Sequence, residues 1–395
     1  MKVTVVGQGY VGLPIAIAAS NSGHIVYGLD SNEEKIKSLL SGKSQIEDFT
    51  DDEIEQALIS KRYIPTSNPK VCKDSEVILI CVPTPLTVEH EPDLTFLVNA
   101  TATVAKNLNS GTLVIIESTI EPGTCRQVIF PILLKNSGLS EDQFYLAYSP
   151  ERIDPTNQKW NIKNTPKLVA GLTQRAAEKS KKFYSEFVDS ITLCSTLEVA
   201  ETAKLLENSF RLINISFINE FAIYCRKVGI DVNEVIKAAS TKPYGFMPFN
   251  PSIGAGGHCI PVDPIYLANA AMKVGVHSRL IDLADHINQE MPSFFVEQSE
   301  KKVGELKSKR ILVIGVSYKP NVSDVRETPV NALISGLNRK GAQVFWHDDL
   351  VKEWNGEKSV ALSSNYDLAI IATPHDYLDL TKLGDIPILN TRGSL

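Results

Sequence analysis

The 395-residue sequence has few cysteines, and their spacing shows no pairing. The six stand at positions 72, 81, 125, 194, 225 and 259, without a CxxC pair. This scatter excludes a four-cysteine zinc site and is unlike the disulfide framework of small secreted proteins. No HExxH or similar ligand spacing occurs either, so we predict no metal site. We expect a reduced, cytoplasmic protein in which any chemically active thiol acts alone.

Long apolar runs are also missing. No stretch reaches the roughly 20 residues that a membrane-spanning helix requires, and residues 1–7 form a short strand-like run rather than a secretory signal. The net charge of −6 provides no broad basic face for nucleic-acid binding. We therefore expect no membrane and no nucleic-acid partner.

What the first half contains is an alternation of short apolar runs with helical patterns. The runs are near-continuously apolar, as in strands buried on both faces of a parallel sheet. Strands are expected at residues 2–7, 25–30, 76–82, 112–117, 144–149, 167–170 and 191–194. Segments 93–108 and 173–187 fit crossover helices, so residues 1–196 are predicted to form a Rossmann domain of the α/β class.

The pattern changes near residue 197. Residues 197–229 repeat apolar residues at helical spacing, which predicts a helix roughly 45 Å long. A glycine- and proline-rich loop at 243–257 interrupts the helical stretch that follows, and an α/β pattern returns after residue 305. We predict two Rossmann-like, doubly wound parallel-sheet domains, 1–196 and 305–395, joined by a helical region at 197–304 that contains the long helix.

A glycine-rich turn follows the first expected strand and opens a helix. Gly7, Gly9 and Gly12 form GxGxxG, with Tyr10 and Val11 between the last two glycines. In this context the glycines let the backbone approach a pyrophosphate, and the helix N-terminus supplies N–H donors. The turn therefore predicts a dinucleotide site.

The end of the second expected strand selects the dinucleotide. Asp30 stands there, and its carboxylate would accept hydrogen bonds from the adenosine ribose and repel a 2′-phosphate. This favours NAD over NADP. Thr84, after the third of these strands, is a further predicted cofactor contact.

Two more groups suggest chemistry. The glycine-rich stretch 254–257 precedes Cys259, and such backbone can approach a ligand closely. Asp263 lies on the same side as Cys259 if a helix begins there, and Lys204 and Asn208 project together at helical spacing i, i+4. Alone, these residues also fit a buried thiol and a solvated polar stripe.

Together the motifs resemble the UDP-glucose/GDP-mannose dehydrogenase family of nucleotide-sugar 6-dehydrogenases. The resemblance covers essentially the whole chain, through GxGYVGLP at the start, VPTP at 82–85, ESTxxPG at 117–123, SPER at 149–152, AKLLENSFR in the long helix, GGHCIPVDP around Cys259, YKPNVSDVRETP at 318–329 and NTRG at 390–393. It implies two Rossmann-like domains and a long helix that builds a homodimer or a higher homo-oligomer.

The resemblance implies NAD-dependent, four-electron oxidation of a UDP-sugar at C6, for surface polysaccharide synthesis. Cys259 would trap the aldehyde as a thiohemiacetal and then carry a thioester that water hydrolyses. Lys204 and Asn208 match residues that stabilise the oxyanion. Asp263 matches the carboxylate that works with the lysine and orients the water.

Other matches concern protons and ligand contacts. Thr119 and Glu151 match residues that handle protons and water near the first oxidation, Thr119 also beside the cofactor. Arg326 matches a cofactor-facing arginine. The predicted substrate contacts are Glu151, Lys204, Asn208, Phe249, Asn250, Gly256, His258, Lys319 and Arg392. Lys163 and Lys167 could reach a uracil or a phosphate, although lone lysines are more often solvated.

Departures from the UDP-glucose branch indicate the sugar. That branch usually has GGSCFPKD, where this chain has GGHCIPVD with His258 and Val262. This pattern, with EPDLT at 91–95 and KPYGF at 242–246, resembles the branch that acts on UDP-N-acetylhexosamines and favours UDP-N-acetylglucosamine. UDP-N-acetylmannosamine and UDP-glucose are the alternatives.

Two other functions fit parts of the sequence. A single-step dehydrogenase of the β-hydroxyacid type would use the lysine and asparagine, but it needs neither Cys259 nor residues 310–393. A non-catalytic nucleotide-sugar or NAD sensor would keep the fold without needing the full catalytic set.

Overall fold

The structure is a computed structural model that describes residues 1–44, 46, 49–154, 157 and 159–393. The chain forms two compact units. The N-terminal unit comprises Met1–Glu207 and Ile265–Lys273, and the C-terminal unit comprises Asn208–Pro264 and Val274–Leu395. The three-domain division at residues 196 and 304 stays a prediction.

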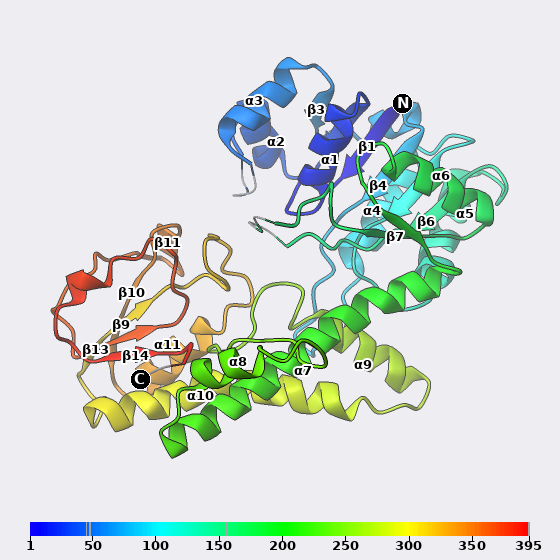
Figure 1. Ribbon diagram of the computed structural model, residues 1–395. Helices are drawn as coiled ribbons and strands as arrows, with labels where there is room; N and C mark the ends of the chain where they lie inside the picture. The colour runs from blue at the N-terminus through cyan, green and yellow to red at the C-terminus, as the bar shows by residue number, and fades with distance from the viewer. Residues whose placement is uncertain (45, 47–48, 155–156, 158, 394–395) are drawn as a thin grey trace. The chain divides into compact units, whose positions relative to one another are not determined.

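An eight-stranded sheet with strand order β3-β2-β1-β4-β5-β6-β7-β8 organises the N-terminal unit (Figure 1). Its strands are β1 (Lys2–Val6), β2 (Ile25–Leu29), β3 (Tyr63–Thr66), β4 (Val77–Ile80), β5 (Leu113–Ile116), β6 (Tyr145–Tyr148), β7 (Lys167–Gly171) and β8 (Ile191–Leu193). Neighbouring strands pair in parallel except β6 and β7, which are antiparallel. The predicted doubly wound α/β class is confirmed.

Apolar layers cover both faces of this sheet because alternate residues of each strand point to opposite faces. Val114 and Ile116 belong to one buried cluster, and Leu113 and Ile115 belong to the other. The helices are α1 (Gly12–Asn21), α2 (Glu33–Leu40), α3 (Asp51–Ile59), η1 (Pro69–Asp74), α4 (Thr95–Ala105), η2 (Cys125–Ile129), α5 (Phe130–Ser137) and α6 (Gln174–Tyr184). The sequence did not predict β3, whose interior Pro65 is tolerated because the strand lies at the sheet edge.

The long predicted helix is present as α7 (Leu197–Val228). Its first turns are fixed to the N-terminal unit by Glu201, whose buried carboxylate accepts the N–H groups of Gly123 at 2.5 Å and Cys125 at 3.1 Å. None of the helices in the described ranges is long and apolar enough to cross a membrane.

The C-terminal unit has a four-stranded parallel sheet with strand order β10-β9-β13-β14. Its strands are β9 (Arg310–Ile314), β10 (Gln343–His347), β13 (Leu368–Ile371) and β14 (Ile388–Asn390), beside a hairpin of β11 (Glu353–Trp354) and β12 (Glu357–Lys358). The helices after α7 in this unit are α8 (Val232–Ala239), α10 (Arg279–Val303), α11 (Val330–Arg339) and η3 (Leu380–Leu383). Helix α9 (Asp263–Lys273) belongs to the N-terminal unit from Ile265 onward. A second Rossmann-like sheet was predicted, whereas β14 and the hairpin were not.

Candidate cofactor and catalytic sites

Two glycines of the turn after β1 have no room for a side chain. Gly7 has φ +91°, and a Cβ there would lie 2.5 Å from the carbonyl oxygen of Cys81. A Cβ on Gly12 would lie 1.8 Å from the carbonyl oxygen of Gly7. Gly9 has open space beside its Cα, and the first turn of α1 has no side-chain cap, so backbone N–H groups there fit a pyrophosphate.

Asp30 follows β2, and its carboxylate is held by several donors. It accepts the N–H groups of Gln8 at 2.8 Å and Asn32 at 2.9 Å, and the Lys35 ammonium lies 2.9 Å away. Burial opposes ionisation of this carboxyl, but the bonds from Lys35 and the two backbone N–H groups outweigh burial and keep the pKa of Asp30 below its usual value. The side chain is therefore an ionised acceptor, as the ribose contact requires.

Parallel pairing brings further predicted residues to the edge of the sheet that carries the glycine turn. Thr84, Thr119 and Glu151 follow β4, β5 and β6, whose carboxyl ends share that edge. The carbonyl oxygen of Thr84 accepts the Tyr266 hydroxyl at 3.1 Å. The structure thus gathers these three residues, and their roles stay predictions.

The sequence analysis did not single out Glu117 at the same edge, and it favoured a solvated position for Lys167. Both residues are buried, and Lys167 Nζ lies 2.7 Å from Glu117 Oε2. Burial raises the pKa of Glu117 to about 7, although Lys167 opposes the shift. The available signal was a charged residue at one end of each of two apolar strand segments, VIIE and KLVA.

Two side chains of the predicted thiol site, the Asp263 carboxylate and the Asn208 amide, are hydrogen-bonded in the C-terminal unit. The side-chain amide of Asn208 donates to Asp263 Oδ2 at 2.6 Å. The N–H of Asp263 donates to the carbonyl oxygen of Cys259 at 2.8 Å, and α9 begins at Asp263. The helical turn expected between Cys259 and Asp263 is therefore present. Lys204 lies on α7 in the N-terminal unit and is buried.

The surroundings of the thiols distinguish Cys259 from most of the others. Cys72, Cys81, Cys125 and Cys225 are buried, whereas Cys194 and Cys259 are half-buried, and none of the six forms a disulfide in the described structure. Burial raises the pKa values of the Cys72, Cys81, Cys125 and Cys225 thiols, which disfavours their nucleophilic thiolate forms. The described residues contain no group of three or more His, Cys, Asp or Glu side chains able to hold a metal.

The glycines before Cys259 approach the protein's own chain closely. A Cβ on Gly256 would lie 2.7 Å from the carbonyl oxygen of Glu327, and one on Gly257 would lie 2.7 Å from the Tyr318 ring. Close packing against the 318–329 segment therefore explains why glycine stands at both positions. A substrate contact of Gly256 stays a prediction.

Arg326 joins the same two segments. Its guanidinium binds Asp324 through Nε at 2.9 Å and Nη2 at 2.6 Å, and Nη2 lies 3.2 Å from His258 Nδ1. These contacts fix His258 beside the 318–329 segment. The structure thus gives both residues neighbours in the protein, and the predicted ligand contacts of both are untested.

The other predicted substrate residues are spread over the C-terminal unit. Phe249 packs edge-on against Phe210, with ring centroids 6.0 Å apart, and Asn250 is exposed. Lys319 accepts the Ser317 hydroxyl at its backbone carbonyl, 2.9 Å away. Arg392 follows β14, and burial lowers the pKa of its guanidinium.

The backbone around Asp348 in the C-terminal sheet is arranged like that around Asp30, but the Asp348 carboxylate is already bound by groups of the protein. The Gly315 N–H donates to the carbonyl oxygen of His347 at 2.8 Å, as the Gly7 N–H donates to that of Leu29 at 2.8 Å. Asp348 then takes the position of Asp30. Its fully buried carboxylate is engaged by His375 and by the N–H groups of Val316, Ser317, Leu350 and Val351.

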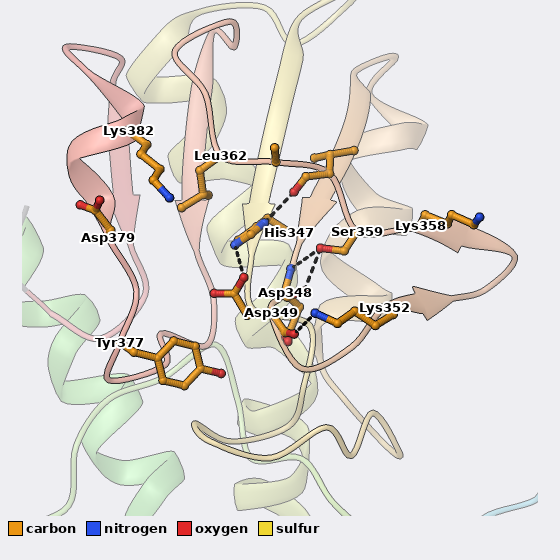
Figure 2. Close-up of a pocket in the computed structure, with 12 residues that line it drawn as sticks. His347, Asp348, Asp349, Lys352, Lys358, Ser359, Leu362, Tyr377, Asp379 and Lys382 are labelled. Carbon is orange, nitrogen blue, oxygen red and sulfur yellow. Dashed lines mark hydrogen bonds and ion pairs between the residues drawn. The ribbon is translucent and has the colours of Figure 1, made fainter.

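A cavity of about 470 Å³ lies beside Asp348 (Figure 2). It is lined by His347, Asp348, Asp349, Lys352, Lys358, Ser359, Val360, Ala361, Leu362, Tyr377, Asp379 and Lys382. The predicted site residues are absent from this lining, as far as the structure describes them. The carboxylate engagement above also makes the cavity unlike the ribose site at Asp30.

Three domains of one known protein family match this chain in order. The UDP-glucose/GDP-mannose dehydrogenase family matches through its NAD binding domain at residues 1–188, its central domain at 198–290 and its UDP binding domain at 312–389. The chain is 34% identical to a UDP-N-acetyl-D-glucosamine 6-dehydrogenase of Salmonella typhi and 36% identical to a UDP-N-acetyl-D-mannosamine dehydrogenase of Pyrococcus horikoshii. Each alignment covers 95% of this chain and 90% of the relative.

The fold comparison agrees with the sequence comparison. A solved structure of a UDP-D-ManNAc dehydrogenase from Pyrococcus horikoshii superposes with a TM-score of 0.91 at 33% identity, over 99% of this chain and 95% of that chain. The matched UDP binding domain at 312–389 is not needed by a β-hydroxyacid dehydrogenase, so that alternative fails. The chain belongs to the UDP-glucose/GDP-mannose dehydrogenase family and is an NAD-dependent nucleotide-sugar 6-dehydrogenase.

Proposed function

We propose that the protein oxidises UDP-N-acetylglucosamine at C6 to UDP-N-acetylglucosaminuronate. The observation that carries the four-electron part of the proposal is that Asp263 is bound on both sides. Its backbone N–H donates to the backbone carbonyl oxygen of Cys259 at 2.8 Å, and its carboxylate accepts the Asn208 amide at 2.6 Å. A thiol one helical turn from a fixed carboxylate suits covalent capture of an aldehyde and later hydrolysis. A single alcohol oxidation would need no such thiol.

The chemistry requires the removal of two hydrides. Each is accepted by NAD⁺, the cofactor of this family. The Cys259 thiolate adds to the C6 aldehyde to form a thiohemiacetal, whose oxidation leaves a thioester. Water then attacks the thioester carbonyl, the C–S bond breaks, and the carboxylate leaves with the thiolate restored. We assign orientation of this water to Asp263.

Charge developing on the substrate oxygen needs fixed donors. One N–H of the Asn208 amide is bound to Asp263, which leaves the second N–H for the oxyanion. We assign the same stabilising role to Lys204. Thr119 and Glu151 serve the first oxidation, in which the C6 hydroxyl must lose its proton as the hydride leaves.

Support for the gluco sugar comes from the EPDLT and KPYGF motifs and from the relatives named for UDP-N-acetyl-D-glucosamine. EPDLT also has a local role, because Asp93 Oδ1 accepts the Thr95 N–H at 2.9 Å at the start of α4. The manno epimer is the second candidate, since relatives at 36% sequence identity and at a TM-score of 0.91 carry that name. Use in surface polysaccharide synthesis and a cytoplasmic location stay predictions.

The reaction is tested by the NADH formed per sugar consumed. We expect two NADH per UDP-N-acetylglucosamine, because the alcohol passes through the aldehyde to the acid without release. UDP-N-acetylmannosamine and UDP-glucose, assayed in parallel, should give lower kcat/KM. One NADH per sugar would contradict the covalent mechanism, and a higher kcat/KM for the manno epimer would reassign the substrate.

Replacing the nucleophile tests the covalent step. Cys259→Ser should lower two-step turnover roughly a thousandfold, because a serine hydroxyl stays protonated and forms no thioester. Single-turnover mixing should show at most one NADH per active site. Cys194→Ser is the matched control, because Cys194 is the other half-buried thiol. Two NADH per sugar at the normal rate in Cys259→Ser would exclude Cys259 as the nucleophile.

Asp30 is tested through cofactor preference. Asp30→Asn should shift the ratio of kcat/KM for NADP⁺ over NAD⁺ upward by about one to two orders of magnitude, because it removes charge repulsion and a charged hydrogen bond. Asp348→Asn is the control, because Asp348 has the same place in the other sheet and should affect stability without altering the ratio. An unchanged ratio in Asp30→Asn would remove this assignment.

We further propose that the protein is a homodimer through α7. Phe210, Phe217 and Tyr224 recur every seven residues on this helix, and their side chains are 46%, 60% and 56% exposed. An apolar stripe with this period fits a second copy of the same helix, because seven residues make about two helical turns.

Charge on this stripe should separate the subunits. Phe217→Asp should convert the dimer to a monomer at micromolar concentration, as measured by light scattering. Ile59→Asp is the control, because Ile59 is also exposed but lies on α3. A wild-type monomer, or a Phe217→Asp variant that stays dimeric, would contradict the proposal.

A further inference from the structure

A buried charged cluster lies behind the predicted proton-handling residue of the N-terminal unit. Lys167 Nζ is 2.7 Å from Glu117 Oε2, and the Tyr184 hydroxyl donates to Glu117 Oε1. The Lys167 ammonium also lies 5.0 Å from the centre of the Tyr184 ring. Glu117, Lys167 and Tyr184 are all buried, so these charges are weakly screened by water.

The sheet topology explains how this cluster forms. Glu117 follows β5, and Glu151 follows the parallel neighbour β6. Strand β7 runs antiparallel to β6, so its first residue, Lys167, arrives at the edge where β5 and β6 end. A single reversed strand therefore places one ammonium between two carboxylates.

The two oxygens of Glu151 have different surroundings. Oε1 accepts the N–H groups of Arg152, at 2.5 Å, and Ile153. Oε2 is buried, has no hydrogen-bond partner among the described residues, and lies 3.6 Å from Lys167 Nζ. Arg152 is itself paired with Glu207 and donates to the Pro166 carbonyl oxygen at 2.8 Å, which fixes the backbone beside Glu151.

We propose that Lys167 and Glu117 are positioning residues: the Lys167 ammonium holds Glu151 Oε2, the proton acceptor of the first oxidation, and Glu117 holds Lys167. The inference rests on the role of Glu151 in the proposed function. As the C6–H electron pair leaves as hydride to NAD⁺, the C6 hydroxyl O–H bond breaks and its proton bonds to Oε2. The oxygen electrons form the C=O bond. The Lys167 ammonium attracts Oε2 before the transfer, and Glu117 keeps that ammonium in place.

The acidic limb of the kcat/KM profile for the sugar tests the charge of Lys167. Lys167→Met should move this limb to higher pH by about one pH unit or more, because Glu151 loses an ammonium within 4–6 Å. Glu117→Gln should leave the limb near its wild-type position, because burial raises the pKa of Glu117 to about 7 and the group is already mostly protonated along the acidic limb.

A measurement on the unliganded protein provides an independent readout. Burial favours the protonated form of Glu117 in the folded state and raises its pKa to about 7, against a usual value of 4.5. The folded state thus binds more protons in this window, so wild-type stability should fall as pH rises from about 4.5 to 7, relative to Glu117→Gln. The Tm of both proteins across this range measures the difference.

Control variants separate positioning from structure. Lys167→Arg keeps the charge and should leave the limb near its wild-type position. Lys181→Met removes an exposed lysine from α6 and should leave the profile unchanged. Tm values for all variants identify those that merely unfold.

The outcomes distinguish the inference from the function on which it rests. Glu151→Gln should greatly reduce the first hydride transfer, and near-normal activity in this variant would remove the proposed role of Glu151. If Glu151→Gln is inactive while Lys167→Met is folded and keeps the wild-type limb, the positioning role alone is overturned. A shift of the limb to lower pH in Lys167→Met would also overturn it.

Discussion

Neighbouring strands of a parallel sheet run in the same direction, so the loops that leave their carboxyl ends must emerge at one edge. In the N-terminal unit this constraint gathers the glycine turn, Thr119 and Glu151 from segments far apart in sequence. The crossover helices between the strands cover both faces of the sheet. At the shared edge Glu117 and Lys167 are buried, so their charges act strongly on one another.

Three carboxylates illustrate how burial and partners determine what such a group can do. Asp30 is ionised through donors from Gln8, Asn32 and Lys35. Asp348 occupies the corresponding place in the other sheet, but four backbone N–H groups and His375 engage it completely. Glu117 has a lysine partner and yet a pKa raised to about 7, because burial dominates. Carboxyl groups at similar places in the fold thus differ: Asp30 is proposed to bind the cofactor, Asp348 holds loops together, and Glu117 anchors Lys167.

Much of the fold was predictable because apolar periodicity reports burial directly. The central strands, the crossover helices α4 and α6, and α7 were found in this way, whereas α2, α3, α5, β3, β14 and the β11–β12 hairpin were not. Those strands are short and lie at sheet edges or outside the sheets, so their burial pattern is weak. Site residues could be predicted where a short motif is formed by neighbouring residues, as in the glycine turn. The packing of Gly256 against Glu327 could not be predicted, because Glu327 is distant in sequence.

The sequence by itself determined the α/β class, the NAD-binding turn, the long helix and the family, because each depends on local spacing or on motifs in a fixed order. Only the tertiary structure decided that Lys167 is buried rather than solvated, and that it lies between Glu117 and Glu151. The reason is the antiparallel pairing of β7 with β6, which brings the start of one strand to the ends of two others. Strand direction is a property of the assembled sheet, and no local pattern of residues records it.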